Sequence, residues 1–325
     1  MESNNARMRA LLWLLVTSIC FVSGGATCSR RQPDLLLPPP PPVLGGNPAL
    51  TDVVNSVNRT SVIRELSSSS STVDVLSMPA LPKLSATLAY RRDRDFRLRA
   101  SLPIIMGTGL DMGSNQEVFW FEVPEQGGRT LYFARHDLYQ QQLDRAVLPV
   151  DPTWISDALG LVQIDPNQVV AGPVMRPDGK LEVRSTMPLA AGVFQRVCYI
   201  DASAGHVTDQ FLFAPSGARI AESHASNHQY YADVQCALPH SVQMTLTPNG
   251  GPPLQMQIDV GSYAVNQILS GDPNLFVMPQ GAANTVDLTT VSPASTGTII
   301  PTSFQQATKY QNDEIGPLPY RGLVR

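Results

Sequence analysis

Alternation of apolar and polar residues with a period of two constrains the fold of this chain more than any other feature of its sequence. Apolar side chains recur at alternate positions within the stretches Leu84–Ala100 and Val242–Val260. Successive side chains of a β-strand point to opposite faces, so the pattern predicts half-buried strands. Turns rich in Gly, Pro, Asn and Ser separate the strands about every ten residues, which is typical of an antiparallel sheet.

Two short helices accompany the predicted strands. Apolar positions starting at Val53 favour a helix over Leu50–Leu66. Pro152 near a helix start favours a second helix over Trp154–Leu161. The serine run Ser67–Ser71 is predicted to be a loop.

A twisted sheet of about ten strands is too wide to stay flat, so it must curl. We therefore predict a mainly β (α+β) fold: a strongly curved open antiparallel sheet, or half-barrel, closed by short helices. Its concave face would be apolar, and either the helices or an apolar ligand must fill it. For any single residue, a plain core position is the stronger interpretation. The candidates for lining a ligand cavity are Leu98, Phe119, Trp120, Phe121, Met244, Leu246, Met256 and Ile258.

The first residues have the order of an export signal: Arg7 and Arg9, then the apolar run Leu11–Val22, then small residues before Cys28. A bilayer-spanning helix needs roughly 20 apolar residues, and this run is shorter. We expect Cys28 to be the site of lipid attachment after cleavage, which would anchor the chain in a membrane. The alternative is ordinary cleavage near Ala26 and a soluble mature protein.

These features predict four regions. They are a signal peptide over residues 1–27, a lipid-anchored proline-rich linker over 28–48, a half-barrel domain over 49–288 and a disordered tail over 289–325. The five prolines of Pro38–Pro42 favour an extended polyproline II conformation.

Charge and motifs exclude several classes of function. The net charge of −4 and the scarcity of Lys argue against nucleic acid as a partner. We find no nucleophile elbow, phosphate-binding loop or zinc motif. His224 and His228 are four residues apart and could share a metal only on a helix, so solvated or hydrogen-bonded histidines are the stronger interpretation. We expect no enzymatic activity, no cofactor and no metal.

Two cysteines lie beyond the leader. Cys198 and Cys236 both fall in segments that are predicted to be strands. A disulfide between them and two buried free thiols are both compatible with the sequence.

The stretches Leu84–Pro124 and Leu238–Gly281 carry a family resemblance. The first has apolar alternation, a basic pair, an aromatic residue, a turn and an aromatic-rich strand. The second has a Leu-Pro entry, two amphipathic strands and a closing Phe-x-x-Pro at Phe276–Pro279. This pattern resembles the LolA/LolB-like outer-membrane lipoprotein carrier superfamily. Within it, the chain is most similar to a planctomycete-type group of envelope lipoproteins of unassigned role.

The resemblance implies a half-barrel whose cavity holds lipid or lipoprotein acyl chains. It implies a place in the cell envelope, at the periplasmic face of the outer membrane, and a role in lipoprotein transport or insertion. Arg92 falls at the position of an arginine that contacts the lid in the soluble carrier, although Asp93 replaces the proline that follows it there. A solvated arginine at the end of a strand is the alternative interpretation of Arg92. The alternative is a structural or scaffolding envelope lipoprotein that transfers no ligand, and a hydrolase is the least supported function.

Overall fold

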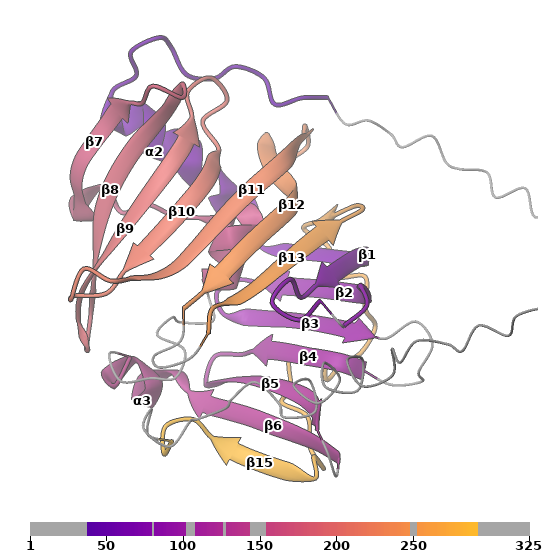
Figure 1. Cartoon of the computed structure of the whole chain (residues 1–325). Coiled ribbons are helices and arrows are strands. Elements are labelled where there is room, and N and C mark those ends of the chain that lie inside the picture. Colours follow the sequence, from indigo (N-terminus) through magenta and orange to yellow (C-terminus); the bar gives the residue numbers. More distant parts are fainter. Residues whose placement is uncertain are drawn as a thin grey trace, which may run out of the picture. The chain divides into compact units, whose positions relative to one another are not determined.

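The computed structural model describes residues 38–79, 81–101, 108–125, 128–143, 154–247 and 252–291. Within these residues the chain forms a 15-stranded sheet with a few short helices (Figure 1). The leader, Cys28 and most of the predicted tail lie outside the described residues.

The first half of the chain supplies one part of the sheet. Its helical segments are α2 (Leu50–Val57), the 3-10 segment η1 (Asn58–Val62) and α3 (His136–Gln141). Its strands are β1 (Glu65–Asp74), β2 (Leu84–Arg91), β3 (Asp95–Ser101), β4 (Thr108–Ser114), β5 (Val118–Glu125) and β6 (Gly128–Arg135).

The second half supplies the rest. It begins with α4 (Trp154–Ser156), the π-helical segment η2 (Asp157–Leu161) and η3 (Pro166–Gln168). Its strands are β7 (Val169–Met175), β8 (Lys180–Leu189), β9 (Gly192–Asp201), β10 (Val207–Phe213), β11 (Arg219–Tyr231), β12 (Cys236–Leu246), β13 (Leu254–Val260), β14 (Ala264–Val265) and β15 (Asn284–Asp287).

Pairing between β1 and β13 joins the two halves into one sheet. The strand order is β15-β6-β5-β4-β3-β2-β1-β13-β12-β11-β10-β9-β8-β7, with β14 also on β1. Neighbours along this order pair antiparallel, except that β15 runs parallel to β6. Most pairings join strands that are consecutive in the sequence. The turns between the predicted strands therefore indicated much of this topology correctly.

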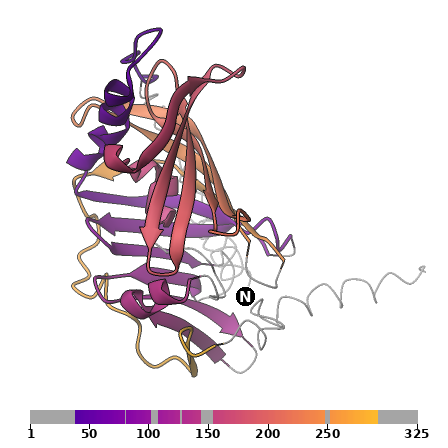
Figure 2. The same ribbon diagram turned by 90° about the vertical axis from the view of Figure 1, so that its left-hand side faces the viewer.

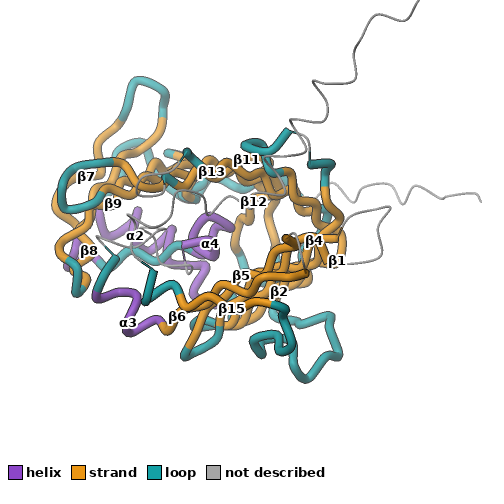
Figure 3. Tube along the Cα trace, turned by 60° about the horizontal axis from the view of Figure 1, so that its bottom comes forward, coloured by secondary structure: helices purple, strands orange, loops and turns teal. Residues whose placement is uncertain are grey.

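The sheet is curved, open and not closed into a barrel, which confirms the predicted fold class. In Figure 2 the strands from the middle of the chain, drawn in pink, run across those from its first third, drawn in purple. Figure 3 shows α2 and α4 inside the curve of the sheet, with α3 at its rim. Short helices thus fill the concave side.

The prediction for residues 50–71 was wrong in two places. The helical stretch ends at Val62, and the serine run lies within strand β1 instead of a loop. Pairing of β1 with both β2 and β13 overrides the low strand propensity of serine. Ser67, Ser68 and Ser71 are buried, and the register shifts between Ser68 and Ser71.

Two apolar clusters occupy the concave side. The larger one contains side chains from β1–β3, β5, β9–β13 and α4. The smaller one joins the valines of α2 to β8, β9 and the start of β10. None of the helices in the described part of the chain has the length and hydropathy that a bilayer crossing needs.

Candidate functional site

The apolar wall of the concave side contains most of the predicted cavity residues. Leu98, Phe119, Met244, Leu246, Met256 and Ile258 belong to the larger cluster, and Phe121 packs against it. The register pairs Met244 with Met256 and Val242 with Ile258, so these side chains do face the same way. All six cluster members are buried, so the chain itself covers them.

Trp120 was placed on the wrong face. It alternates with Phe119 and Phe121 on β5, and successive strand residues point to opposite faces. Its ring lies on the outer side, over Gly113 of β4 and 5.1 Å from the guanidinium of Arg97. Trp120 is therefore a buried residue of the outer face and cannot line the concave wall.

One segment that packs on the wall is residues 154–164, which we call the plug. Trp154, Ile155, Ala158, Leu159 and Leu161 of the plug belong to the larger apolar cluster. The plug is not a regular helix, because Gly160 has φ +92°. A side chain at Gly160 would meet the Pro239 ring of β12 at 2.7 Å, so glycine also permits the close approach of the plug to the wall.

Polar contacts from the sheet hold the plug. Arg196 of β9 is 7% exposed, and its guanidinium lies 3.2 Å from Asp157 Oδ2 and donates to the Gln163 carbonyl at 2.7 Å. Gln210 of β10 donates to the Asp157 carbonyl at 3.0 Å. We call Arg196, Asp157, Gln163 and Gln210 the latch.

A second set of polar contacts fixes the end of the plug to the N-terminal helices. The Asn58 side chain donates to the Ile164 carbonyl and accepts from the Ile164 N–H, both at 2.8 Å. Gln163 donates to the Thr60 hydroxyl at 2.8 Å. The C-terminal end of the plug is therefore more firmly tied than its start.

Arg92 contacts the N-terminal helices. Its guanidinium donates to the carbonyls of Ile63 at 3.1 Å and Thr60 at 3.0 Å. It thus satisfies carbonyls at the end of η1, and Thr60 is also a partner of the plug residue Gln163. A direct contact of Arg92 with the plug stays a prediction.

Cys198 and Cys236 are separate buried thiols. They lie on β9 and β12, with β10 and β11 between them, a separation of about 14 Å at the usual strand spacing. A disulfide needs Cα atoms less than about 7 Å apart, so the disulfide alternative was wrong. Burial raises the pKa of each thiol to about 11.

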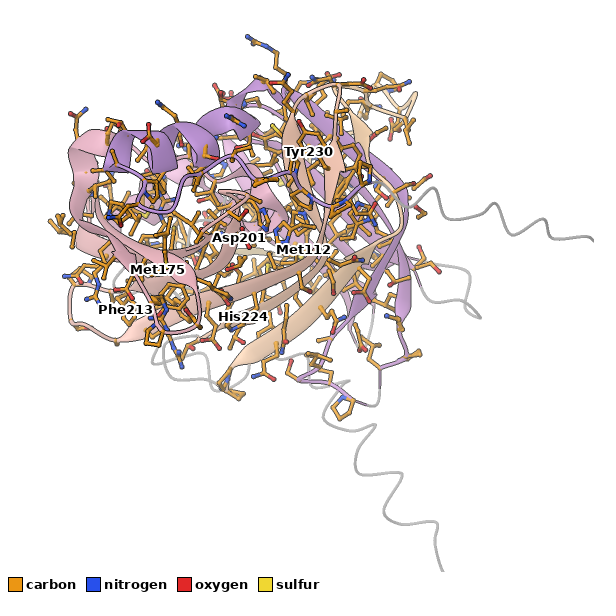
Figure 4. All side chains as sticks on the ribbon, turned by 90° about the horizontal axis from the view of Figure 1, so that it is seen from above. Met112, Met175, Asp201, Phe213, His224 and Tyr230 are labelled. Atoms are coloured by element: carbon orange, nitrogen blue, oxygen red, sulfur yellow. The ribbon has the colours of Figure 1, made fainter. Side chains whose placement is uncertain are left out.

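A shallow cleft lies beside the smaller apolar cluster. The proline run of the predicted linker forms one side, and Val43 and Leu44 donate to the Ser203 carbonyl. His206 and His228 line the other side with rings stacked 3.9 Å apart. Burial lowers the pKa of His228 to about 3, which leaves it neutral. The nearby residues Asp201 and Tyr230 are labelled in Figure 4.

His224 lies on the outer face. Its Nδ1 is 2.6 Å from Asp209 Oδ1, and Lys180 is 2.7 Å from Asp209 Oδ2. The hydrogen bond to Asp209 raises the pKa of His224. His224 and His228 lie on strand β11 instead of a helix, and the described residues hold no group of three His, Cys, Asp or Glu side chains placed for a metal ion.

The outer face also carries a second buried arginine. Arg97 of β3 is 3% exposed, forms an ion pair with Asp111 of β4, and donates to the carbonyls of Leu275 at 3.2 Å and Val277 at 2.8 Å. Phe276, which begins the Phe-x-x-Pro element, lies between these two residues, and its carbonyl accepts a hydrogen bond from the Asn115 side chain. We call Arg97, Asp111 and the segment Leu275–Val277 the clasp.

Arg196, Asp157 and Gln210 were missed by the sequence reasoning. A charged or amide residue at an inward position of an alternating strand is the signal that could have found two of them. Arg196 stands between Phe194 and Cys198, and Gln210 two positions before Leu212.

Comparison of the sequence with protein-family models and with curated proteins finds no match. Among solved structures, the chain is similar to an outer membrane lipoprotein-sorting protein domain from Vibrio parahaemolyticus, with 8% identity, a TM-score of 0.43, and 68% of this chain and 95% of that chain covered. It is similar to a LolA superfamily protein from Nitrosomonas europaea, with 9% identity, a TM-score of 0.39, and 70% and 97% covered.

A third similar structure is a DUF1329 family protein from Desulfovibrio piger, with 8% identity, a TM-score of 0.41, and 67% and 92% covered. The class that the chain's own geometry defines is an open half-barrel with an apolar concave wall. A LolA-like family stays what the resemblance of the sequence implies.

Proposed function

We propose that this chain is a cell-envelope protein that binds a lipid, or the acyl chains of a lipoprotein, on its concave wall after the plug moves aside. Binding and release need no catalysis. The observation that carries the proposal is that a short, irregular segment packs on the apolar wall, where hydrogen bonds from Arg196 and Gln210 of the sheet hold it. The family resemblance of the sequence implies the same class of ligand.

The energies of plug and ligand are comparable. Burying the large apolar side chains Trp154, Ile155, Leu159 and Leu161 stabilises the docked plug by roughly 6–12 kcal/mol. An acyl chain of about a dozen carbons gains roughly 10 kcal/mol at about 0.8 kcal/mol for each buried CH₂. An acyl chain can therefore replace the plug side chains on the wall.

The plug is also suited to move. A helical segment this short is unstable by itself in water, so its structure depends on docking. The plug should therefore lose its structure when it leaves the wall. It forms a unit that can open locally while the sheet stays folded.

Tryptophan fluorescence can test this opening. Trp154 is 4% exposed on the plug, whereas Trp120 is 1% exposed on the outer face. We expect titration with dodecanoate to shift the Trp154 emission to longer wavelength as the plug leaves. Trp120→Phe should keep the response and Trp154→Phe should lose it. A full-length protein that shows no shift and carries no lipid in native mass spectrometry would contradict the proposal.

We also propose that Cys28 carries the lipid anchor, so that the domain works at the periplasmic face of a membrane. The order of basic, apolar and small residues before Cys28 supports this. Mass spectrometry of the mature N-terminus should find an acylated cysteine. An unmodified N-terminus, or processing insensitive to globomycin, would contradict the anchor but not the lipid-binding wall.

A scaffolding function is the second candidate, because the chain's own side chains already fill the concave side. Met256→Trp distinguishes the two. If the wall binds lipid, the added volume should reduce lipid binding more than stability. If the wall is only a core, overpacking should cost about 1–3 kcal/mol in stability and leave partner binding unchanged.

A further inference from the structure

We infer that the ligand of the concave wall is an amphiphile with an anionic head group, a carboxylate or a phosphate, which takes the place of the Asp157 carboxylate at Arg196. This inference rests on the proposed lipid-binding function and names the chemistry of the ligand.

Arg196 lies at the boundary of the two apolar clusters. Its neighbours at alternate positions on β9 are Phe194 in the larger cluster and Cys198 in the smaller one, at 0% and 1% exposure. A guanidinium does not lose its charge in proteins, so it needs a partner in this surrounding.

The hydrogen-bond partners that the structure gives to Arg196 belong to the plug. They are the Asp157 carboxylate and the Gln163 carbonyl. Among the residues that the structure describes, the buried Arg196 Nε has no hydrogen-bond partner. A departing plug therefore takes both partners with it, and the Nε–H is a third donor that a ligand could engage once the plug has left.

A neutral acyl chain cannot replace these hydrogen-bond partners of Arg196. It would restore apolar contacts to the wall and leave a buried positive charge unpaired, which is strongly unfavourable. A carboxylate or phosphate accepts two parallel hydrogen bonds from a guanidinium, which adds both energy and orientation. Displacement of the plug is thus coupled to the charge of the arriving head group.

Other polar groups on the wall extend the head-group site. Gln210 donates to the Asp157 carbonyl, and its buried Oε1 has no hydrogen-bond partner within the described part of the chain. Ser185 pairs with Arg196 across β8 and β9, and Ser223 pairs with Gln210 across β10 and β11; both serines are buried. The Asp157 side chain is 27% exposed, so the head group would lie near solvent and the acyl chain along the wall.

The test compares ligands that share a chain and differ in the head. Dodecanoate, dodecyl phosphate and 1-dodecanol are titrated into the full-length protein below their aggregation concentrations, with acetate and inorganic phosphate as heads without a chain. We expect the two anionic amphiphiles to bind about tenfold or more tightly than the alcohol, as a charge-assisted hydrogen bond predicts.

Three variants sharpen the test. Arg196→Gln should reduce the ratio of acid to alcohol affinity to about one, and Arg196→Lys should restore part of it. Asp157→Asn should raise affinity for both ligands, because it removes the internal competitor, and should keep the ratio. Arg219→Gln is the matched control, since Arg219 pairs with Glu222 and is 54% exposed. If Arg196→Gln does not fold, the ratio of acid to alcohol affinity in wild type and in Arg196→Lys decides whether the anionic head group is recognised.

The outcomes separate the two proposals. Equal affinity of wild type for dodecanoate and dodecanol would overturn the anionic head group and leave lipid binding intact. Binding of acetate or inorganic phosphate as tightly as the amphiphiles would overturn the amphiphile and indicate a small-anion site. No binding of any chain-bearing ligand would overturn the proposed function itself.

Discussion

The clasp on the outer face and the latch on the concave side both centre on a buried arginine paired with an aspartate, yet they are built differently. Arg97 and Asp111 lie on adjacent strands and are 3% and 8% exposed. Arg196 lies on a strand, but Asp157 lies on the plug and is 27% exposed. A pair within the sheet can separate only when the sheet unfolds, whereas a pair between sheet and plug can separate while the sheet stays folded.

Removing an arginine from the clasp should have the largest effect. Arg97→Met leaves Asp111 as a buried carboxylate without its main partner, which costs about 3–5 kcal/mol of unfolding free energy. Urea unfolding measures this change. Arg99→Gln is the control, because Arg99 is 37% exposed and should change stability by less than about 1 kcal/mol. Equal effects of the two substitutions would contradict the assignment of Arg97 to the clasp.

Truncating apolar side chains compares wall and plug. Leu98 on the wall and Leu159 on the plug are both 0% exposed. We expect Leu98→Ala to cost about 3 kcal/mol in global unfolding. Leu159→Ala should cost less globally and should raise amide hydrogen exchange in residues 154–164 without raising it in β2 and β3. Exchange that rises equally in plug and strands would show that the plug does not open separately.

The latch arginine should matter less than the clasp arginine for global stability. We expect Arg196→Met to cost about 1–2 kcal/mol, because the Asp157 carboxylate is 27% exposed and solvent can compensate for the loss of Arg196. Hydrogen exchange of the plug should increase in this variant. A loss of unfolding free energy as large as that of Arg97→Met would show that the latch pair, like the clasp pair, separates only when the sheet unfolds.

The smallest effect should come from the pair of His224, which is exposed, and Asp209. The hydrogen bond to Asp209 raises the pKa of His224 above its usual value near 6.5. The stabilisation is therefore complete below pH 6.5 and is lost as pH rises through the raised pKa. Because His224 is 47% exposed, we expect less than about 1 kcal/mol. Urea unfolding of wild type and His224→Gln from pH 5 to 8 should differ most at the acidic end, and a constant difference would contradict this.

The sequence predicted the fold better than it predicted the site. Period-two alternation placed strands such as β2, β12 and β13, because one face of each is buried and the pattern reports that directly. It failed for β1, where serines are held by two partner strands that are distant in sequence. Local patterns carry no information about such pairing.

The sequence identified residues of the apolar wall but not the contacts that hold the plug on it. Met244 and Met256 were found on the wall because they follow the alternation of their strands. Trp120 was misplaced because Phe119, Trp120 and Phe121 were all named as cavity candidates, although consecutive residues of a strand point to opposite faces. The latch joins residues 39 positions apart, Asp157 and Arg196, and no local pattern indicates which inward arginine will meet which carboxylate.

The two ends of the sheet bear on how copies of this chain behave at high concentration. At one end, the four-residue strand β15 follows the clasp segment and pairs parallel to β6. At the other, the register of β7 breaks between Val169 and Ala171 and again between Ala171 and Val174. Within the described residues, neither end is a long strand of regular register, which is what edge-to-edge addition of further strands requires. A sheet this wide can thus stay finite, without fibril growth from its borders.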